Sequence, residues 1–360
     1  MKKVISMLVI VCMILTLAAC AAPTAPATPP AETPDTTPAE TPATPAAEAP
    51  ADSIVVKYNV TFGATGVQAD GARALGELIE YYSEGRLVFE FYPSSQLGDA
   101  SSTFEALRAG TIEMTESSTT ALSGFNPMWS TFALPYLWDN GAQAINAIMD
   151  PAVQAKLIAD AESHGFVIIG WYNIGSRSVM NTRRLTTNPQ ELSGLLVRVI
   201  EDPILAASMN AMGAIAAPMP MGEVFTALQQ GTIDGVEHSP SALYDFSFHE
   251  VANYLTLTEH FTIPGVVFVS KVWFDGLSPE NQAAVMQAGA SWTEHWNNEI
   301  WPQADYNGIA ALTAQGVQIA EIDKTPFIEA TQSVRDNFLA DATDDQRALF
   351  ELLMEARARQ

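Results

Sequence analysis

The chain has 360 residues and a formal net charge of −24, because 41 aspartates and glutamates outnumber 17 lysines and arginines. The acidic balance, with no cluster of basic residues, argues against nucleic-acid binding. The two cysteines are Cys12 and Cys20, so the chain beyond them has no disulfide and depends on its core for stability. The length of about 300 residues from Ser53 onward predicts two lobes.

The first twenty residues have the pattern of an export signal. Lys2 and Lys3 precede an apolar run over 4–17, which is too short to span a membrane, and small residues lead to Cys20. This order resembles the lipobox of bacterial lipoproteins. The resemblance implies cleavage of a signal peptide over 1–19, lipidation of Cys20 with palmitate, and anchoring to the outer face of the cytoplasmic membrane, in the periplasm or cell-wall space. An ordinary signal peptide with a chance cysteine is the alternative.

A low-complexity segment follows. Residues 21–50 are almost entirely Ala, Pro, Thr and Glu, and they cannot bury enough apolar surface to offset the entropy of ordering. We therefore predict that 20–53, with the lipidated Cys20 at its start, is a disordered, partly extended tether.

Strands and helices alternate after this tether, as in an α/β fold. Turn residues and hydrophobic patterns predict, in chain order, a strand over 54–62, a helix over 69–83, a strand over 87–92, a helix over 151–163, a strand over 166–171, a turn capped by Asn188, and a long helical stretch from Ser278 and Pro279 onward. Trp292 and Trp296, four residues apart on that last helix, are expected to pack in the core.

Two segments of the chain repeat each other. Residues 104–116 and 225–237 share Phe, Ala, Leu, Gly, Thr, Ile, an acid and a final glutamate at a constant spacing of 225 − 104 = 121. Each copy predicts a helix that ends at a glycine, Gly110 or Gly231, followed by a strand. Chance similarity is the alternative to two equivalent lobes. Because equivalent strand ends tend to face a shared cleft, Glu116 and Glu237 are placed on opposite walls, with His238 beside the second.

Arg198 is an unusual residue for its surroundings. It lies in the apolar, β-branched run 195–200, which predicts a strand, and a guanidinium keeps its charge and is costly to bury alone. The segment by itself leaves two interpretations open. Arg198 either extends from an edge strand towards water or binds a planar carboxylate of a ligand through its paired donors.

Common catalytic and metal-binding motifs are absent from the sequence. There is no G-x-S-x-G, H-E-x-x-H, phosphate loop or dinucleotide fingerprint, and the five histidines lack metal-ligand spacing. We expect no enzyme, cofactor or metal. The remaining enzymatic alternative is a hydrolase that uses Glu116 and Glu237 as a carboxylate pair.

Several motifs resemble the solute-binding subunits, of the DctP-like family, of tripartite ATP-independent periplasmic (TRAP) transporters. The match runs in order over about residues 54–350. Its motifs are Tyr92–Asp99, Ala133–Tyr136, Ser193–Val199, Pro218–Phe225, Ala227–Gly235 with Glu237, Glu250-Val251, Tyr254-Leu255 and Thr258–His260.

The resemblance implies two α/β lobes that close on an organic acid like a clamshell, joined by a long helix spanning both. It also implies delivery to the small and large membrane subunits of a TRAP permease. The carboxylate-pairing arginine of the family falls on Arg198, a second arginine on Arg177, and a contact to the distal part of the ligand on Glu116. Trp171 is added to this distal pocket from its position at a strand end.

Two positions differ from the commoner family pattern. His238-Ser239 replaces Asn-Pro, and Met221 replaces an aromatic ring. His238 could donate a hydrogen bond to the carboxylate or carry a charge at mildly acidic pH, and Met221 offers an adaptable wall. The identity of the acid therefore stays open.

The predicted organisation has five parts: the signal peptide 1–19, the tether 20–53, lobe I over 54–175 with 264–303, lobe II over 176–263 with 304–325, and C-terminal helices over 326–360. A binding lipoprotein of an ABC importer or of a sensory system is the nearest alternative function. A neighbouring gene for an ATPase would favour the ABC importer, and a neighbouring pair of membrane-protein genes would favour the TRAP system.

Overall fold

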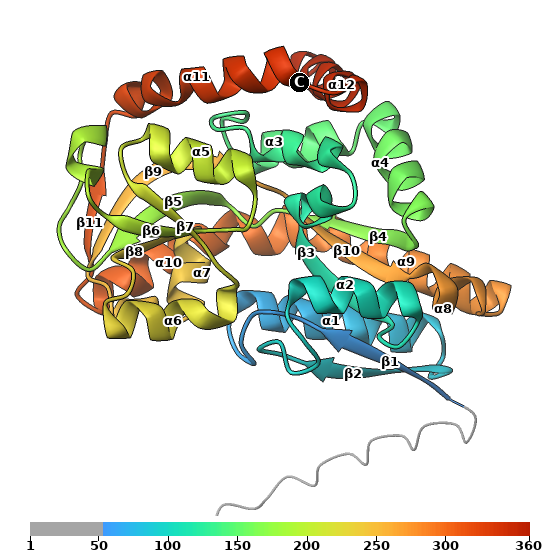
Figure 1. The fold of residues 1–360 in the computed structure, drawn as a ribbon. Helices are drawn as coiled ribbons and strands as arrows, with labels where there is room; N and C mark the ends of the chain where they lie inside the picture. The colour runs from blue at the N-terminus through green and yellow to red at the C-terminus, as the bar shows by residue number, and fades with distance from the viewer. Residues whose placement is uncertain (1–52) are drawn as a thin grey trace, which may run out of the picture. The chain divides into compact units, whose positions relative to one another are not determined.

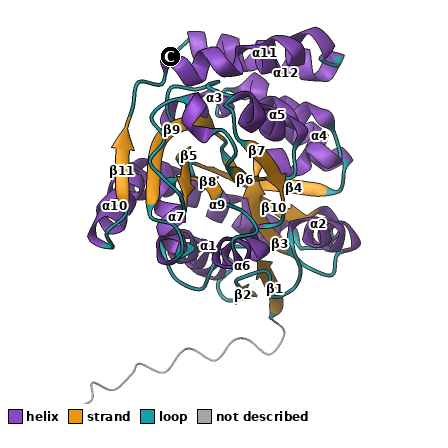
Figure 2. Cartoon of the chain, turned by 60° about the vertical axis from the view of Figure 1, so that its left-hand side comes forward, coloured by secondary structure: helices purple, strands orange, loops and turns teal. Residues whose placement is uncertain are grey.

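The computed structural model describes residues 53–360. The predicted signal peptide, Cys20 and nearly all of the predicted tether lie outside the described residues. The described chain is a mixed α/β fold built on two sheets, which agrees with the predicted fold class (Figures 1 and 2).

The first sheet has the strand order β2-β1-β3-β10-β4, and the second has the order β11-β9-β5-β8-β6-β7. We call the parts of the fold around them lobe I and lobe II. The strands of lobe I are β1 (Ile54–Asn59), β2 (Leu87–Tyr92), β3 (Met114–Ser118), β4 (Phe166–Tyr172) and β10 (Gly265–Ser270). Those of lobe II are β5 (Ser176–Asn181), β6 (Leu196–Val199), β7 (Ile215–Pro218), β8 (Gly235–His238), β9 (Tyr254–Thr262) and β11 (Gln318–Glu321).

Five strands of each sheet share one topology. In lobe I, β1 runs parallel to β2 and β3, and β10 runs antiparallel to β3 and β4. In lobe II, β6 runs parallel to β7 and β8, and β5 runs antiparallel to β8 and β9. The repeated helices are α2 (Ala100–Ala109) and α6 (Met221–Gln230), and each ends at the predicted glycine in the left-handed conformation, with φ of 72° at Gly110 and 69° at Gly231. The internal repeat is therefore a structural one.

Shorter helices surround the two sheets. Those next to lobe I are α1 (Val67–Tyr82), α3 (Gly141–Ile148), α4 (Pro151–Ser163), α8 (Lys271–Asp275) and the 3₁₀ helices η1 (Thr119–Gly124) and η2 (Pro127–Ala133). Those next to lobe II are α5 (Pro203–Ala211), α7 (Pro240–Asp245), η3 (Pro189–Leu192) and η4 (Phe248–Glu250). The first strand ends three residues earlier than predicted, and the first helix begins two residues earlier.

A nearly continuous helical run joins the lobes. It consists of α9 (Pro279–His295), a π-helical turn η5 (Trp296–Ile300) and α10 (Trp301–Ala314). The α9 helix packs on α1 and β4 of lobe I, whereas α10 packs on α7 of lobe II. Trp296 is buried and stacks on Trp292, as predicted for the core, and its Nε1 donates to the carbonyl oxygen of Asn173 (2.8 Å) in the crossing between β4 and β5.

The C-terminal helices form a second bridge. In both views α11 (Thr325–Asp341) and α12 (Asp344–Ala358) lie along one side of the described fold (Figures 1 and 2). The α11 helix packs on α5 and β9, and α12 packs on α3, α4 and η2. The chain crosses from lobe I to lobe II at 173–175 and back at 263–264. The predicted lobe limits remain a proposal, and these crossings agree with them.

Candidate functional site

A cavity of about 700 Å³ lies between strand ends of the two lobes. Its walls include Glu116 of β3 and Tyr172 of β4 from lobe I. Lobe II contributes Arg177 of β5, Arg198 of β6 and His238 of β8. The two lobes therefore present different chemistry to one shared space.

Arg198 is buried in this cavity wall without an ion pair among the described residues. The β6 strand lies between β8 and β7, so Arg198 is not on an edge strand, and only 3% of the residue is exposed. Its Nε donates to the carbonyl oxygen of Met219 (2.9 Å), while Nη1 has no hydrogen-bond partner among residues 53–360. Burial lowers the pKa of Arg198 to about 10; the nearby carboxylates of Glu237 and Glu201 oppose this shift and Arg177 adds to it, so the group stays cationic at neutral pH. The interpretation in which Arg198 extends into water is wrong.

Arg177 and Glu237 form a buried ion pair beneath the cavity. The guanidinium Nε and Nη2 donate to the two carboxylate oxygens of Glu237, the latter at 2.8 Å, and Nη2 also donates to the Glu237 carbonyl oxygen (2.9 Å). Such bidentate geometry neutralises both charges. Arg177 still lines the cavity, whereas Glu237 has no exposed surface and does not. Glu237 is thus placed to hold Arg177, and its burial and pairing argue against its use as a reactive carboxylate with Glu116.

His238 lines the cavity as a neutral ring. Burial, followed by the neighbouring guanidinium groups of Arg177 and Arg198, holds the pKa of His238 well below its usual range. The backbone N–H of Ser239 donates to Nδ1 (2.9 Å), which assigns the ring proton to Nε2. Of the two predicted roles, hydrogen-bond donor fits this environment and a charge at mildly acidic pH does not.

Glu116 lines the cavity from lobe I, and its carboxyl group has a raised pKa. Tyr58, buried behind it, donates its hydroxyl to Glu116 Oε2, and the Tyr172 ring lies alongside. Burial raises the pKa of Glu116 to about 7 in spite of these two hydroxyl groups, which act in the opposite direction. Near neutral pH this carboxyl can therefore both accept and donate hydrogen bonds.

Met221 and Trp171 have different locations. Met221, the first residue of α6, lines the cavity. Trp171 lies in the hydrophobic core of lobe I and does not line it. Successive side chains of a strand point to opposite faces, so the neighbouring Tyr172 takes the place predicted for Trp171.

Sequence reasoning missed several cavity residues. Gln68 at the start of α1 lines the cavity, and its buried Oε1 has no partner within the described part of the chain. Hydroxyl groups also line the walls, from Thr61, Ser95, Ser101, Ser102, Ser117, Ser118, Thr120 and Ser123. The serine-rich runs at 94–95, 101–103 and 117–120 were the available signal for this hydroxyl-rich lining.

The part of the chain that the structure describes contains neither a candidate metal site nor a membrane-spanning helix. Within residues 53–360, no group of three or more His, Cys, Asp and Glu side chains could hold a metal ion. Within the same range, no helix has the length and apolar character needed to cross a membrane.

The cavity between the two α/β lobes combines a buried guanidinium that has no ion pair among the described residues, many hydroxyl groups and the carboxyl groups of Asp99, Glu105, Glu116, Glu201 and Glu223. Such a site suits a protein that binds a small polar solute whose anionic group is held at one point, by Arg198. Comparison with known proteins agrees with this class. Residues 59–341 match the family model described as bacterial extracellular solute-binding protein, family 7 (DctP). The chain belongs to this family, as the sequence motifs predict.

Individual relatives show which ligands occur among similar proteins. The 2,3-diketo-L-gulonate-binding periplasmic protein YiaO of Escherichia coli (strain K12) is 30% identical over 295 residues, which are 80% of this chain and 89% of the relative. The C4-dicarboxylate-binding periplasmic protein DctP of Rhodobacter capsulatus is 30% identical over 251 residues, 69% of this chain and 74% of the relative. A TRAP periplasmic solute-binding protein from Sulfitobacter sp. NAS-14.1, solved with bound β-D-galacturonate, is 27% identical with a TM-score of 0.79, and the match covers 84% of this chain and 100% of that one.

Proposed function

We propose that this protein captures a hydroxylated organic monoacid, of the sugar-acid class, and delivers it to a TRAP membrane permease. The observation that carries the proposal is the guanidinium of Arg198 in the wall of the cavity, which has no ion pair among the described residues. A ligand carboxylate would supply the missing partner through charge-assisted hydrogen bonds. Arg177 and the neutral His238 would support the same carboxylate.

The far wall favours hydroxyl groups over a second carboxylate. Glu116 lies there with a pKa of about 7, so a second anionic group beside it would meet a partly ionised carboxyl. Gln68 also lines the cavity, and an amide side chain can accept a hydrogen bond from one ligand hydroxyl and donate one to another. These groups match the hydroxyls of a sugar acid, the kind of ligand in the Sulfitobacter structure, better than the second acid of a C4-dicarboxylate.

A thermal-shift and calorimetric screen tests this assignment. We expect galacturonate, glucuronate, gulonate or a related monoacid to raise the unfolding midpoint by several degrees, and succinate and malate to do so less. Arg198→Ala should abolish the effect, and Arg198→Lys should weaken it strongly because an ammonium cannot form a paired contact. The exposed Arg183→Ala, on the same lobe, is the matched control. Undiminished affinity in Arg198→Ala would contradict the proposal.

The proposal extends to the chain's location. We infer export, signal cleavage before Cys20 and a lipid anchor at that cysteine, on the strength of the sequence pattern alone. Metabolic labelling with palmitate should mark the wild type and leave Cys20→Ser unlabelled. Equal labelling of the wild type and Cys20→Ser would contradict the anchor. Retention of Cys20→Ser on washed membranes to the same extent as the wild type would contradict it as well.

A further inference from the structure

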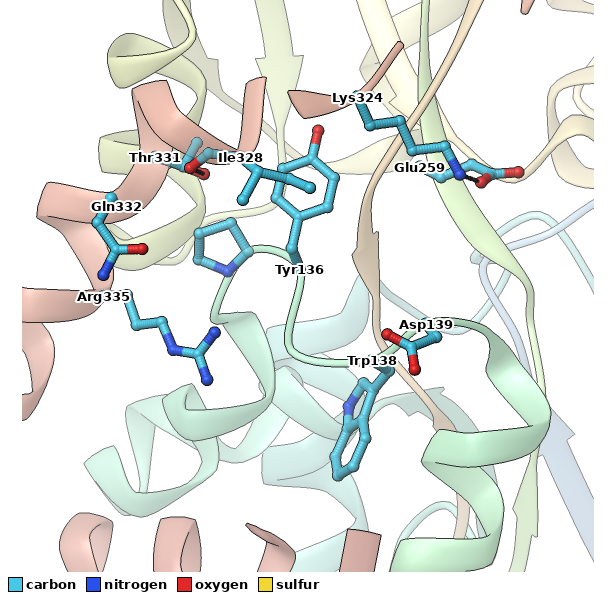
Figure 3. Close-up of a pocket in the computed structure, with 10 residues that line it drawn as sticks. Tyr136, Trp138, Asp139, Glu259, Lys324, Ile328, Thr331, Gln332 and Arg335 are labelled. Atoms are coloured by element: carbon cyan, nitrogen blue, oxygen red, sulfur yellow. Dashed lines mark hydrogen bonds and ion pairs between the residues drawn. The ribbon is translucent and has the colours of Figure 1, made fainter. Parts of the chain in front are cut away.

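A second pocket lies apart from the solute cavity. It has a volume of about 340 Å³ and lies between α11, the end of β9 and the loop over 134–140 that follows η2 (Figure 3). None of its lining residues lines the solute cavity. Two motifs with no place in the solute cavity, Ala133–Tyr136 and Thr258–His260, meet here.

The backbone around this pocket is tightly constrained. The N–H of Tyr136 donates to the carbonyl oxygen of His260 (3.0 Å), and the Tyr136 hydroxyl donates to that of Thr258 (3.1 Å). Tyr136 and Glu259 both have left-handed backbone angles, with φ of 51° and 45°. Non-glycine residues adopt this conformation at a cost, and such residues concentrate at functional sites.

Of the four charged residues that line the pocket, Arg335 alone forms no ion pair among the described residues. Lys324 is paired with Glu259, and Asp139 is paired with Arg357 (2.8 Å). Arg335 on α11 has neither a hydrogen bond nor an ion pair within residues 53–360, and its Cζ lies 5.9 Å from the centroid of the Phe350 ring. Burial, followed by the neighbouring Arg357, lowers the pKa of Arg335, and Asp336 opposes this shift.

The remaining walls combine an unmet donor with apolar surface. Trp138 is 3% exposed, and its Nε1 has no hydrogen-bond partner among the described residues. Figure 3 shows the Arg335 guanidinium and the Trp138 indole on one side of the pocket, with the Lys324–Glu259 pair on the other. Tyr136 and Ile328 supply the apolar part of the lining.

We propose that this pocket is a second binding site, for a small monocarboxylate with an apolar body. The carboxylate would pair with Arg335, and the body would pack on Tyr136, Ile328 and the ring of Trp138. One cation that lacks an ion pair among the described residues favours one negative charge. A bound molecule would touch lobe I through Trp138, lobe II through β9, and the bridging helix α11.

Benzoate is the probe for the test, titrated calorimetrically into the exported protein. We expect saturable binding with a dissociation constant on the order of 1 mM, because so few ligand atoms limit the affinity. Arg335→Gln should weaken it by about tenfold or more, and Arg335→Lys should weaken it less. The matched control is Arg359→Gln, at an exposed arginine that directly follows α12 and pairs with Asp150.

The Arg198→Ala variant separates this site from the solute cavity. Benzoate binding that persists in Arg198→Ala and is weakened in Arg335→Gln, with unchanged unfolding midpoints, supports the proposal. Loss in Arg198→Ala alone would mean that benzoate occupies the solute cavity, and the proposal would be overturned. Absence of saturable binding to the wild type, or equal binding to every variant, would overturn it as well. None of these results depends on whether the solute cavity binds a sugar acid.

Discussion

Replacing Glu116 by glutamine removes the ionisable group with the raised pKa while keeping a side chain of similar size. In the folded protein burial raises the pKa of Glu116 from 4.5 to about 7. The folded chain therefore takes up a proton between these two pH values that the unfolded chain does not hold. Consequently this residue stabilises the fold below pH 4.5 relative to high pH, and its contribution is lost as the pH rises towards 7.

The magnitude follows from the difference in pKa. With 7 − 4.5 = 2.5 units and about 1.4 kcal/mol per unit, the free energy of unfolding should fall by about 3 kcal/mol across this range, most of it between pH 5 and pH 8. Glu116→Gln cannot titrate, so its stability relative to the wild type should rise by about 2–3 kcal/mol from pH 5 to pH 8. The hydrogen bond from Tyr58 sets a constant offset between the two proteins but not this change.

Urea denaturation at pH 5, 6, 7 and 8 measures the effect, and comparison of variant with wild type cancels the titration of other groups. Glu77→Gln, at an exposed position on α1, is the matched control for the substitution itself. A Glu116→Gln difference that stays constant within about 0.5 kcal/mol would refute the reasoning.

Two further predictions concern the scaffold of the site. Arg177→Ala should cost about 3–5 kcal/mol in urea denaturation, because it leaves Glu237 buried without a partner, and adding Glu237→Gln should recover part of that loss; additive effects would contradict the pair's coupling. Gly289→Ala should destabilise the protein although alanine favours helices, because the new Cβ would lie 2.0 Å from the carbonyl oxygen of Ile169. Gly222→Ala, whose Cβ would meet nothing within 4 Å, should be neutral or stabilising by up to about 1 kcal/mol, and equal effects of the two substitutions would contradict the packing argument.

Features that depend on a few neighbouring residues could be predicted from the sequence. Glycine C-caps, the alternation of strands and helices, and the oddity of a charge in an apolar strand all led to correct positions for Gly110, Gly231 and Arg198. The sequence did not show which residues of β4 face the cavity. All seven residues of that strand are buried, so no alternation of polar and apolar residues distinguishes Trp171 from Tyr172.

Other features depend on contacts between distant parts of the chain. Arg177 and Glu237 are 60 residues apart and meet because β5 pairs with β8. Gln68 has no neighbouring motif that would single it out. The pocket at α11 combines a loop, a strand end and a C-terminal helix, so the unpaired state of Arg335 could be recognised only once the other three charges had been paired.

The internal repeat explains why two equivalent glutamates have opposite roles. Glu116 lies opposite Val267 on β10, and Glu237 lies opposite Val179 on β5. Two residues before each valine, lobe I has Gly265 and lobe II has Arg177. A Cβ at Gly265 would lie 2.1 Å from Cζ of Tyr172, so the glycine is what admits that ring beside Glu116. One glutamate therefore meets a phenol and keeps a raised pKa, while the other meets a guanidinium and forms an ion pair.

The same equivalence accounts for Arg198. In the parallel strand pairs, Asn59 lies opposite Thr115 and Arg198 lies opposite Val236, and 236 − 115 = 121 is the spacing of the repeat. Asn59 is satisfied within lobe I, since its amide donates to Thr103 Oγ1 (2.7 Å) and to the carbonyl oxygen of Gly98 (2.9 Å). The longer Arg198 keeps only the contact to Met219 and brings to the cavity a guanidinium that has no ion pair within residues 53–360. The asymmetry of the site, with both lining arginines in lobe II and the lining hydroxyl groups in lobe I, thus arises from a few substitutions at equivalent positions of one repeated scaffold.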